Sequence, residues 1–457
     1  MRIIDARDWV PEGTVTTWLP SAAMKDEATT AQDDPTPASF LQSDHVRGVL
    51  AARGQGRTHH AYTCSVATLP GVPDAVRMTR AVNAFVAAHE GLRSGLSVAG
   101  DAPQEPIERR TLPAAAVDLV ATDVPGVPTD AITELLASTA VFDHVPALVV
   151  ATVAREDAAS FDLLFALDHA SGDGLSQMTG ILELIERYDG ATPDTTPSFL
   201  DYVRDEYARA ATVHDDSPGV RAWRDMFALT DGRVPGFPLP TGVVDGVPQP
   251  AVGWASDGIL ADRDTTARLR DLARAHQVSF STVLYAALGV AHARLTGQDR
   301  YATVVVAATR GRTYAHSQGW FCNFTPLSFP VAAGGVAAVL PDAAAAQARM
   351  KEALDEPVHA SLGHLIGTGQ VDASVMGSPQ MVTYLDLGWF DEPADADVRL
   401  FTGVGRTANA NLWISRNDAG LGLSCQAPDN PTARESVRTY VATLREVLAE
   451  AAVESAR

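Results

Sequence analysis

A segment rich in proline, glycine and threonine divides this sequence into two halves with the same kind of pattern. It runs from residue 189 to about residue 254 and contains one helical piece, residues 199–211. Because such composition is typical of linkers, we predict a first lobe of residues 1–190, a linker region of 191–255 and a second lobe of 256–457. Expected helices and strands alternate in both lobes, which predicts an α/β fold.

Hydrophobic periodicity gives the expected elements of each lobe. Residues 1–38 carry no clear period and are expected to be irregular, with Trp9 and Trp18 as anchors. Helices are expected over residues 39–53, 74–89, 130–138, 175–188, 263–275, 280–295, 343–354 and 434–452, and strands over 62–69, 147–154, 160–167, 301–308, 381–385 and 408–415.

The charge balance argues against two kinds of partner. The chain has 35 Lys and Arg residues against 56 Asp and Glu residues, a net charge of −21. A surface of this sign repels nucleic acid and anionic membranes. The apolar runs are too short to span a bilayer, and the first ten residues carry charges where a signal peptide needs an apolar core. We therefore expect a cytoplasmic protein with no membrane span and no nucleic-acid partner.

Three cysteines, Cys64, Cys322 and Cys425, lie far apart in the sequence. They form no CxxC pair, so neither a zinc site nor a disulfide framework is expected, and this fits a reducing compartment. The histidines are scattered, and no carboxylate cluster has the spacing of metal ligands. No glycine-rich nucleotide motif is present. We expect no metal and no bound cofactor.

The segment LLFALDHASGDGLS, residues 163–176, carries the side chains with the clearest chemical meaning. A strand that ends at His169 is followed by a turn and then by a helix. Gly172 and Gly174 are expected to take the unusual backbone angles of a tight turn. Asp173 is expected to cap the helix. Taken alone, the HxxxDG pattern favours a plain surface turn that contains a histidine.

Four further segments change that interpretation, because they occur with HxxxDG in a fixed order. They are AAHEGLRSGL (87–96), VFDHVPAL (141–148), ATRGRT (308–313) and GWFCNFTPLSFPV (319–331). Together these motifs resemble those of the condensation-domain superfamily, which contains nonribosomal peptide condensation domains and related CoA-dependent acyltransferases. The resemblance extends over roughly residues 39–446.

Finer features resemble one branch of the superfamily, the free-standing polyketide-associated (Pap-type) acyltransferases. These features are RDWVPEGTVTTWLPS (7–21), the GWF of the 319–331 motif and CQAPDNPTARESVRTYVATL (425–444). The resemblance implies two chloramphenicol-acetyltransferase-like lobes in a V-shaped pseudo-dimer with a tunnel between them. The donor would be acyl-CoA or a thioester on the phosphopantetheine arm of an acyl or peptidyl carrier protein. The acceptor would be a small-molecule alcohol or amine that enters from the opposite mouth.

The resemblance also implies roles for single residues. His169 matches the catalytic histidine, and an imidazole suits a general base because it titrates near neutral pH. Asp173 matches an aspartate that pairs with an arginine. We expect Arg310 to be that arginine, with Arg312 as the alternative, and the pair would hold the loop that aims His169. Gly174 matches the turn glycine.

The residues expected to line the tunnel are Asp168, Trp320 and Asn323. Asp168 departs from the family pattern, because most peptide-forming members carry a histidine at this position. The first histidine is usually structural in the family, so activity is not excluded. The departure disfavours amide formation and fits the ester-forming branch, in which this position varies.

Five other residues have simpler interpretations. His59 and His60 suggest a metal site, but successive strand residues face opposite sides of a sheet, so we expect a surface or tunnel-edge position. His89 is expected to be a structural helix terminus. Cys322 could be a nucleophile paired with a histidine, but we expect it to be buried and inert. Trp389 could lie on a crossover segment near the tunnel, although burial alone would explain it.

We therefore expect an acyltransferase that forms an ester, or less readily an amide, in lipid, polyketide or other secondary-metabolite biosynthesis. Two alternatives stay open: an amide-forming free-standing condensation enzyme, and a non-catalytic module that only recruits a partner protein. The intact HxxxDG motif argues against the second. CoA and carrier proteins are anionic, so a chain of net charge −21 needs a local basic patch at one tunnel mouth to dock its donor.

Overall fold

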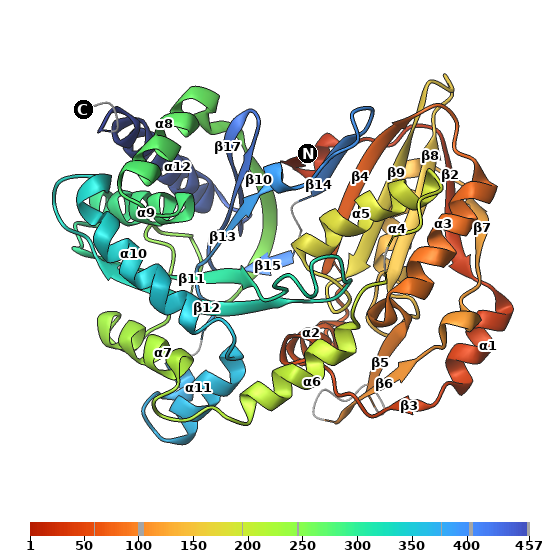
Figure 1. Ribbon diagram of the computed structural model, residues 1–457, viewed down its shortest axis with the longest axis horizontal. Coiled ribbons are helices and arrows are strands. Elements are labelled where there is room, and N and C mark those ends of the chain that lie inside the picture. Colours follow the sequence, from red (N-terminus) through yellow and green to blue (C-terminus); the bar gives the residue numbers. More distant parts are fainter. Residues whose placement is uncertain are drawn as a thin grey trace.

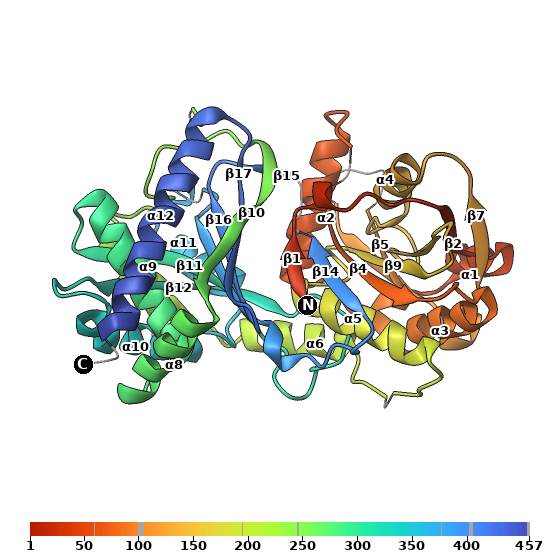
Figure 2. The same cartoon turned by 90° about the horizontal axis from the view of Figure 1, so that it is seen from above.

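Two seven-stranded sheets, each with its own helices, form two lobes that lie side by side as a V (Figures 1 and 2). The computed structural model describes residues 1–58, 60–98, 105–193, 195–244, 246–375, 377–401 and 405–454. The expected two-lobed α/β fold is confirmed.

The sheet of the first lobe has the order β1-β14-β4-β9-β8-β2-β7. Its strands are β1 (Arg2–Ile4), β14 (Asp397–Phe401), β4 (Tyr62–Pro70), β9 (Ser160–Asp168), β8 (Leu148–Ala154), β2 (Thr14–Pro20) and β7 (Leu119–Val124). Apolar side chains of α3 (Ala75–Ala88) and α5 (Gly174–Tyr188) pack on one face, and those of α4 (Pro128–Thr139) pack on the other. The central strand β9 is buried along nearly its whole length, which explains its continuous apolar run.

The remaining elements of the first lobe lie around this sheet. They are α1 (Ala22–Thr30), α2 (Phe40–Arg53) and a small sheet of β3 (Asp33–Asp34), β6 (Ile107–Thr111) and β5 (Ser94–Val98). A capping box starts α2: Ser39 Oγ accepts from the N–H of Gln42 at 3.1 Å, and Gln42 Oε1 accepts from the N–H of Ser39 at 3.0 Å. This fixes the start of the helix that approaches the second lobe.

The sheet of the second lobe has the order β12-β11-β13-β16-β17-β10-β15. Its strands are β12 (Cys322–Pro330), β11 (Arg300–Ala308), β13 (Met381–Asp386), β16 (Asn411–Asn417), β17 (Gly420–Pro428), β10 (Gln249–Asp262) and β15 (Gly405–Thr407). The largest apolar core of the protein joins this sheet to α8 (Arg263–Ala275), α9 (Phe280–Thr296), α10 (Val336–Glu352) and α12 (Pro431–Glu454). A smaller core joins it to α7 (Pro218–Leu229) and α11 (Val358–Gly367).

One helix of the expected linker region contacts both lobes. Phe199 at the start of α6 (Phe199–Ala210) packs edge-on against Phe321 of the second lobe, with ring centroids 5.1 Å apart. Near the other end, the Tyr207 hydroxyl donates to the carbonyl of Ala38 in the first lobe at 2.9 Å. The region of 191–255 is therefore more than a linker, since α7 also belongs to the core of the second lobe.

The division into residues 1–190 and 256–457 needs a correction, because the second half of the chain supplies a strand to the first lobe. β14 pairs antiparallel with β4, with Asp397 opposite Thr68. It also pairs parallel with β1, with Arg399 opposite Arg2. The strand lies among first-lobe elements (Figure 1). Pairing between strands this far apart in the sequence depends on the tertiary fold. A domain boundary placed by local composition therefore could not show it.

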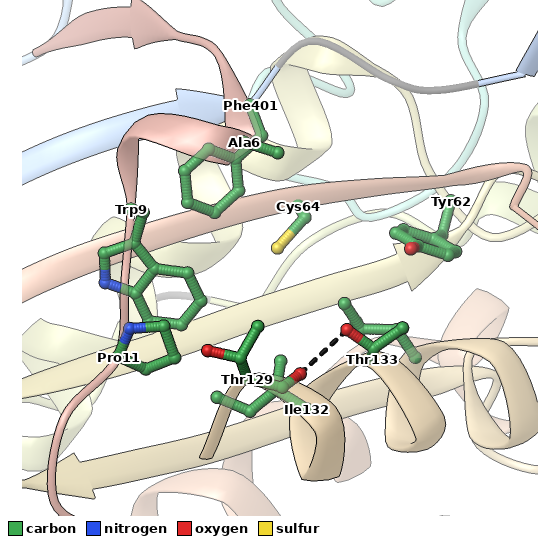
Figure 3. A pocket seen from close by; sticks show the side chains of 10 residues that line it. Ala6, Trp9, Pro11, Tyr62, Cys64, Thr129, Ile132, Thr133 and Phe401 are labelled. Carbon is green, nitrogen blue, oxygen red and sulfur yellow. Dashed lines mark hydrogen bonds between the residues drawn. The ribbon is translucent and has the colours of Figure 1, made fainter. Parts of the chain in front are cut away.

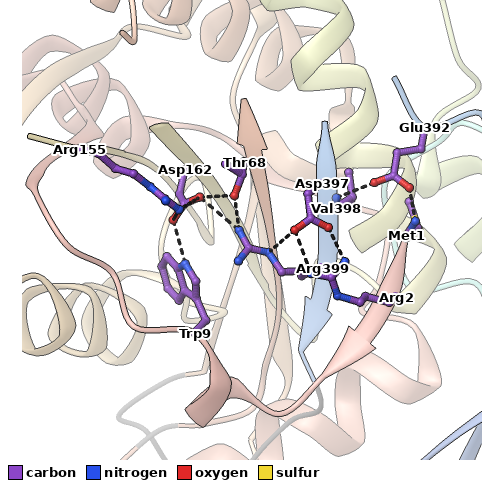
Figure 4. Close-up of polar contacts among 10 residues, drawn as sticks. All are labelled: Met1, Arg2, Trp9, Thr68, Arg155, Asp162, Glu392, Asp397, Val398 and Arg399. Atoms are coloured by element: carbon purple, nitrogen blue, oxygen red, sulfur yellow. Dashed lines mark hydrogen bonds and ion pairs between the residues drawn. The ribbon is translucent and has the colours of Figure 1, made fainter. Parts of the chain in front are cut away.

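Polar side chains fix β14 to the first lobe (Figure 4). Asp162, buried on β9, accepts from Trp9 Nε1 at 3.0 Å and from Arg399 of β14 at 3.2 Å. Asp397 of β14 pairs with Arg2 at 2.6 Å. Burial raises the pKa of Asp162, but its hydrogen bonds and the neighbouring guanidinium groups outweigh that effect and hold the pKa below its ordinary value. The carboxylate therefore stays ionised and keeps β14 attached.

The prediction that residues 1–38 are irregular is wrong. They contain β1, β2, α1 and the short strand β3. The β2 sequence TVTTWLP hides its strand character, because one threonine, Thr17, occupies an inward position where an apolar residue is expected. Thr17 is fully buried, and its hydroxyl donates to the carbonyl of Val150 at 2.9 Å, which satisfies the buried polar group.

Among the described residues, no single helix combines the length and the apolar composition needed to cross a membrane. The adjacent helices α8 and α9 reach that composition only as a pair, which is bent by 104°.

Candidate active site

His169 lies where the two lobes meet, directly after the last residue of β9. Pairing with β4 on one side and β8 on the other fixes the end of this strand. The backbone N–H of His169 donates to the carbonyl of Ala61 at 3.0 Å. The imidazole stacks on Trp320 of the second lobe, with ring centroids 4.0 Å apart and planes inclined by 29°. His169 is partly exposed, so part of its side chain is accessible.

The surroundings of His169 favour its neutral form. Burial lowers the pKa of His169, and the neighbouring His45 lowers it further. Contact with its own backbone and the charges of Asp168 and Asp173 oppose this shift without cancelling it. A histidine with a lowered pKa is unprotonated at neutral pH and can accept a proton. Its Nδ1 is buried, which leaves Nε2 as the nitrogen available to a reactant.

Asp173 caps α5 and forms a buried ion pair with Arg310. The two side chains are only 2% and 4% exposed. Oδ1 of Asp173 accepts from the N–H of Ser176 at 2.7 Å and from Arg310 Nη2 at 2.6 Å, and Oδ2 accepts from the N–H of Phe321 at 2.9 Å. Burial raises the pKa of Asp173, but the charge of Arg310 and these hydrogen bonds outweigh it, so the pKa is lowered. Arg312 is exposed, so the structure selects Arg310, the expected partner.

This ion pair joins the two lobes, because the loop of residues 309–321 reaches from β11 and β12 to the start of α5. The hydroxyl of Ser176 donates to the carbonyl of Gly319 at 2.7 Å, and the Gln318 amide donates to Thr179 at 3.1 Å. The guanidinium of Arg310 lies over the Phe321 ring, 4.6 Å from its centroid. The same loop carries Trp320 and thereby holds its ring against His169.

The expectation that Gly172 and Gly174 take unusual backbone angles is wrong, because neither has a positive φ. Gly172 is needed for close packing instead: a Cβ there would lie 2.5 Å from Cδ1 of the buried Leu167. Around Gly174, a Cβ would meet no described atom within 4 Å. The turn is therefore set by the Asp173 cap and by the packing beneath Gly172.

Asp168 does not line a tunnel, because it is 0% exposed. Its Oδ1 lies 2.9 Å from Nε2 of His45 on α2, and it accepts from the N–H of Ala170 at 2.8 Å. The ring of His45 lies edge-on to Trp320, with centroids 5.9 Å apart, and 6.2 Å from the ring of His169. Sequence reasoning missed His45, because it lies far upstream and its helix shows no pattern that marks it.

Asn323 does not line a tunnel either, because its side chain is used within the second lobe. The amide donates to the carbonyls of Leu354 and Glu356 at 2.9 and 2.6 Å, and its oxygen accepts from the N–H of Val358 at 3.0 Å. Asn323 therefore ties β12 to the connection between α10 and α11. Trp320 alone of the three expected lining residues contacts His169.

Four of the simpler interpretations have structural outcomes. Cys322 is partly buried, and its Sγ lies 3.6 Å from Asp173. Burial and the Asp173 charge raise the pKa of Cys322 well above its ordinary value, which disfavours a thiolate nucleophile. His89 is buried, with Nε2 at 3.0 Å from Glu183, a structural contact at the end of α3. Trp389 is 81% exposed, so burial does not explain it. His59 lies outside the described residues, and His60 is exposed.

Two cavities lie on either side of the start of β4. One, of about 490 Å³, lies between α2 and the second-lobe strands β10 and β15, and His45 is among its lining residues. The other, of about 150 Å³, is an apolar pocket between β4 and α4, with Trp9 and Tyr62 at opposite ends and Cys64 between them (Figure 3). Burial raises the pKa of the Cys64 thiol, so this pocket offers no nucleophile.

Among the described residues, no three His, Cys, Asp or Glu side chains are grouped as metal ligands.

The fold and the site together define a class: a two-lobed α/β protein with a histidine at the lobe junction. The model of the condensation domain matches residues 39–362. Because this is well over half of the chain, the protein belongs to the condensation-domain family.

Relatives of known name match nearly the whole chain. Acyltransferase PapA3 of Mycobacterium tuberculosis is 25% identical over 458 residues, which cover 96% of this chain and 94% of PapA3. The 2'-acyl-2-O-sulfo-trehalose (hydroxy)phthioceranyltransferase PapA1 of the same species is 27% identical over 96% of this chain and 87% of its own. These matches confirm the predicted resemblance to Pap-type acyltransferases.

Solved structures show the same fold. The PapA2 acyl transferase superimposes with a TM-score of 0.88 at 22% identity, covering 99% of this chain and 100% of its own. The first condensation domain of the calcium-dependent antibiotic synthetase has a TM-score of 0.67 at 18% identity, covering 91% of this chain and 96% of its own. The named relatives make the protein an acyltransferase of the condensation family, and it shares its fold with PapA2 and with a condensation domain of a synthetase.

Proposed function

We propose that this protein transfers an acyl group from a phosphopantetheine thioester, free as acyl-CoA or bound to a carrier protein, to a hydroxyl of a small-molecule acceptor. Nε2 of His169 takes the hydroxyl proton as the acceptor oxygen attacks the thioester carbonyl carbon. The tetrahedral intermediate then expels the sulfur, and the protonated His169 returns the proton to the thiolate. The products are an ester and a free thiol, and the thioester is a co-substrate rather than a bound cofactor.

The observation that carries the proposal is the position of His169. It lies at the lobe junction against Trp320, and burial and the neighbouring His45 lower its pKa, which favours the neutral form. The loop beyond it is fixed by the buried pair of Asp173 and Arg310, so the imidazole needs little reorganisation before reaction. A pre-positioned general base contributes a rate factor of about 10² to 10⁴.

Ester formation is favoured over amide formation by two facts. Asp168 occupies the position where peptide-forming relatives carry a histidine, and its carboxylate is engaged with His45. The matched relatives include a trehalose-2-sulfate acyltransferase and PapA1, whose names describe acyl transfer to sulfated trehalose. We propose a sugar or lipid alcohol as acceptor, in lipid, polyketide or other secondary-metabolite biosynthesis.

The experiment that tests this function follows product formation by mass spectrometry. Purified protein receives acyl-CoA of several chain lengths with trehalose, trehalose 2-sulfate, a lipid diol or a primary amine. We expect an ester product with at least one alcohol, and its loss in His169→Ala. Amide formed in preference to ester would support the condensation-enzyme alternative. Absence of transfer and of thioester hydrolysis across donors, including a carrier-bound one, would support the recruitment module.

A further inference from the structure

The 490 Å³ cavity between the lobes is lined by basic side chains from both lobes. His45, Arg53 and Arg57 come from α2 and the turn that follows it, His60 precedes β4, and Arg406 comes from β15 of the second lobe. No aspartate or glutamate is among the described residues that line it. The chain as a whole carries a net charge of −21. The charged side chains that line this cleft are positive, so its local charge is opposite to that of the chain.

The partners of the three arginines show how much positive charge the cleft keeps. Arg53 pairs with Asp143 at 2.7 Å, which offsets its charge. Arg57 donates to the side-chain carbonyl of Gln55 at 2.9 and 3.1 Å. Arg406 donates to the backbone carbonyl of Pro248 at 2.7 Å. Neutral acceptors orient Arg57 and Arg406 without cancelling their charge, and both side chains are exposed.

Helix α2 runs from the reaction centre to the arginines of the cleft. His45 lines one part of the cleft and also touches Asp168 and the ring of Trp320. Arg53 lies two turns further along the helix, about 12 Å away at 1.5 Å per residue, and Arg57 follows it. An extended substrate with its reactive end near His169 would therefore carry its other end to the arginines.

We propose that this cleft binds the anionic ester group, phosphate or sulfate, of an extended substrate, and that Arg57 and Arg406 are its ligands. The inference rests on the proposed function, because it takes His169 to be the reaction centre. Guanidinium groups suit such anions, because their planar N–H donors match the geometry of phosphate-type oxygens. Because Arg57 belongs to the first lobe and Arg406 to the second, binding of the anion would also depend on how the two lobes are placed relative to each other.

Two substrates of the proposed reaction could supply that group. A phosphopantetheine donor carries phosphate at the end remote from its thioester, and a sulfated sugar acceptor carries sulfate near its hydroxyls. Binding, measured by titration calorimetry without turnover, distinguishes the two sources. One arm compares CoA with pantetheine, which lacks phosphate. The other compares trehalose 2-sulfate with trehalose.

The variant to test is Arg57→Glu combined with Arg406→Glu. The matched control is a pair of equal charge changes on α8, Arg268→Glu with Arg270→Glu, both exposed and absent from the cleft lining. We expect the cleft variant to weaken CoA or the sulfated sugar by about tenfold per arginine, and the phosphate-free and sulfate-free compounds to be unaffected. Arg57→Gln with Arg406→Gln keeps N–H donors, and we expect an intermediate loss.

The outcomes separate cleanly. Selective loss of CoA binding assigns the cleft to the donor, and selective loss of the sulfated sugar assigns it to the acceptor. Unchanged binding of both anions, or an equal loss in the α8 control, would overturn the proposal. If no thioester is transferred to any acceptor while the cleft variant still loses anion binding, the proposed function fails and the anion site stands.

Discussion

Nε2 of His45 lies 2.9 Å from the carboxylate of Asp168, so an imidazole from α2 reaches the residue that precedes His169. The contact is buried, with His45 7% exposed and Asp168 0%. In this chain Asp168 stands where most peptide-forming members of the family carry the first histidine of the motif. His45 of α2 thus brings a structural imidazole to the same place from a distant part of the sequence. We regard His45 as a positioning residue that acts on His169 through Asp168 and Trp320.

Replacing His45 tests this positioning role. His45→Ala removes the imidazole that lies 2.9 Å from a buried carboxylate. Leaving a buried polar group without its neighbour costs about 1–3 kcal/mol of unfolding free energy, and we expect kcat to fall more than KM rises. His45→Gln can still donate and should recover part of both losses. Thermal unfolding and steady-state kinetics measure the two effects. Wild-type kcat in a destabilised His45→Ala protein would reduce the role to stability alone.

His169→Ala should lower turnover by about two to four orders of magnitude, the range for loss of a general base. The substitution removes a partly exposed side chain, so the fold should be retained, and circular dichroism checks this. Near wild-type transfer by a folded His169→Ala protein would mean that another group removes the proton.

The pH dependence follows from the lowered pKa of His169. The neutral form is active, so kcat/KM should stay level down to below the ordinary histidine value of about 6.5 and then fall. The unfolded chain binds the extra proton at higher pH than the folded protein does, so His169 also lowers stability as the pH drops below about 6.5. An inflection at or above 6.5 in the His169-dependent activity would contradict the shift.

Asp173 and Arg310 should behave as one unit. Removing either partner leaves a buried charge uncompensated, which costs about 3–5 kcal/mol, so Asp173→Ala and Arg310→Ala should each lower the melting temperature as well as activity. The double variant should cost less than the sum of the two. Arg312→Ala, at an exposed position on the same loop, serves as the control. Additive losses would show that the two residues act independently.

Gly172 and Gly174 should respond differently to alanine. Gly172→Ala places a methyl group 2.5 Å from Leu167 Cδ1, and overpacking of this kind costs about 1–3 kcal/mol. Gly174→Ala adds a methyl group in open space in the first turn of α5, where alanine favours the helix by up to about 1 kcal/mol. Melting temperatures compare the two. If Gly174→Ala folds well but loses activity, the bare backbone at this position is needed by the substrate.

Salt should raise the apparent KM for the CoA donor. The net charge of −21 repels the donor at long range, and the cleft arginines attract it at contact. Screening weakens both, but the close contacts carry more of the binding energy. The Arg57→Glu and Arg406→Glu double variant should lose this salt dependence. A donor KM that falls with salt in the unmodified protein would mean that long-range repulsion dominates.

Motif order predicted the part of the site that is local in sequence. His169, Asp173 and the α5 cap lie within one short segment, and Arg310 lies in a second motif, so their pairing could be expected from the motifs. His45 could not be found in this way, because it joins the site only through the packing of α2. Asp168 and Asn323 were placed on the tunnel by family position, whereas their hydrogen bonds bury them.

The fold was predictable where periodicity was strong and obscured where it was weak. The expected strand at 160–167 and helix at 263–275 agree closely with β9 and α8, because burial on fixed faces imposes their patterns. β2 escaped detection because its buried Thr17 is satisfied by a carbonyl of β8. β14 escaped because its partners lie more than three hundred residues away.

The position of β14 has a consequence for how the chain is made. β1 comes early in the sequence, whereas its partner strand β14, with Arg399 opposite Arg2, is synthesised after most strands of both sheets. More than two hundred residues separate β9 from β14, which is roughly 10–50 s of translation at about 5–20 residues per second. During that time the edge of β4 has no strand to pair with. The nascent first lobe therefore waits with an open sheet edge at β4 until β14 has been synthesised, and an unpaired sheet edge can pair with another chain.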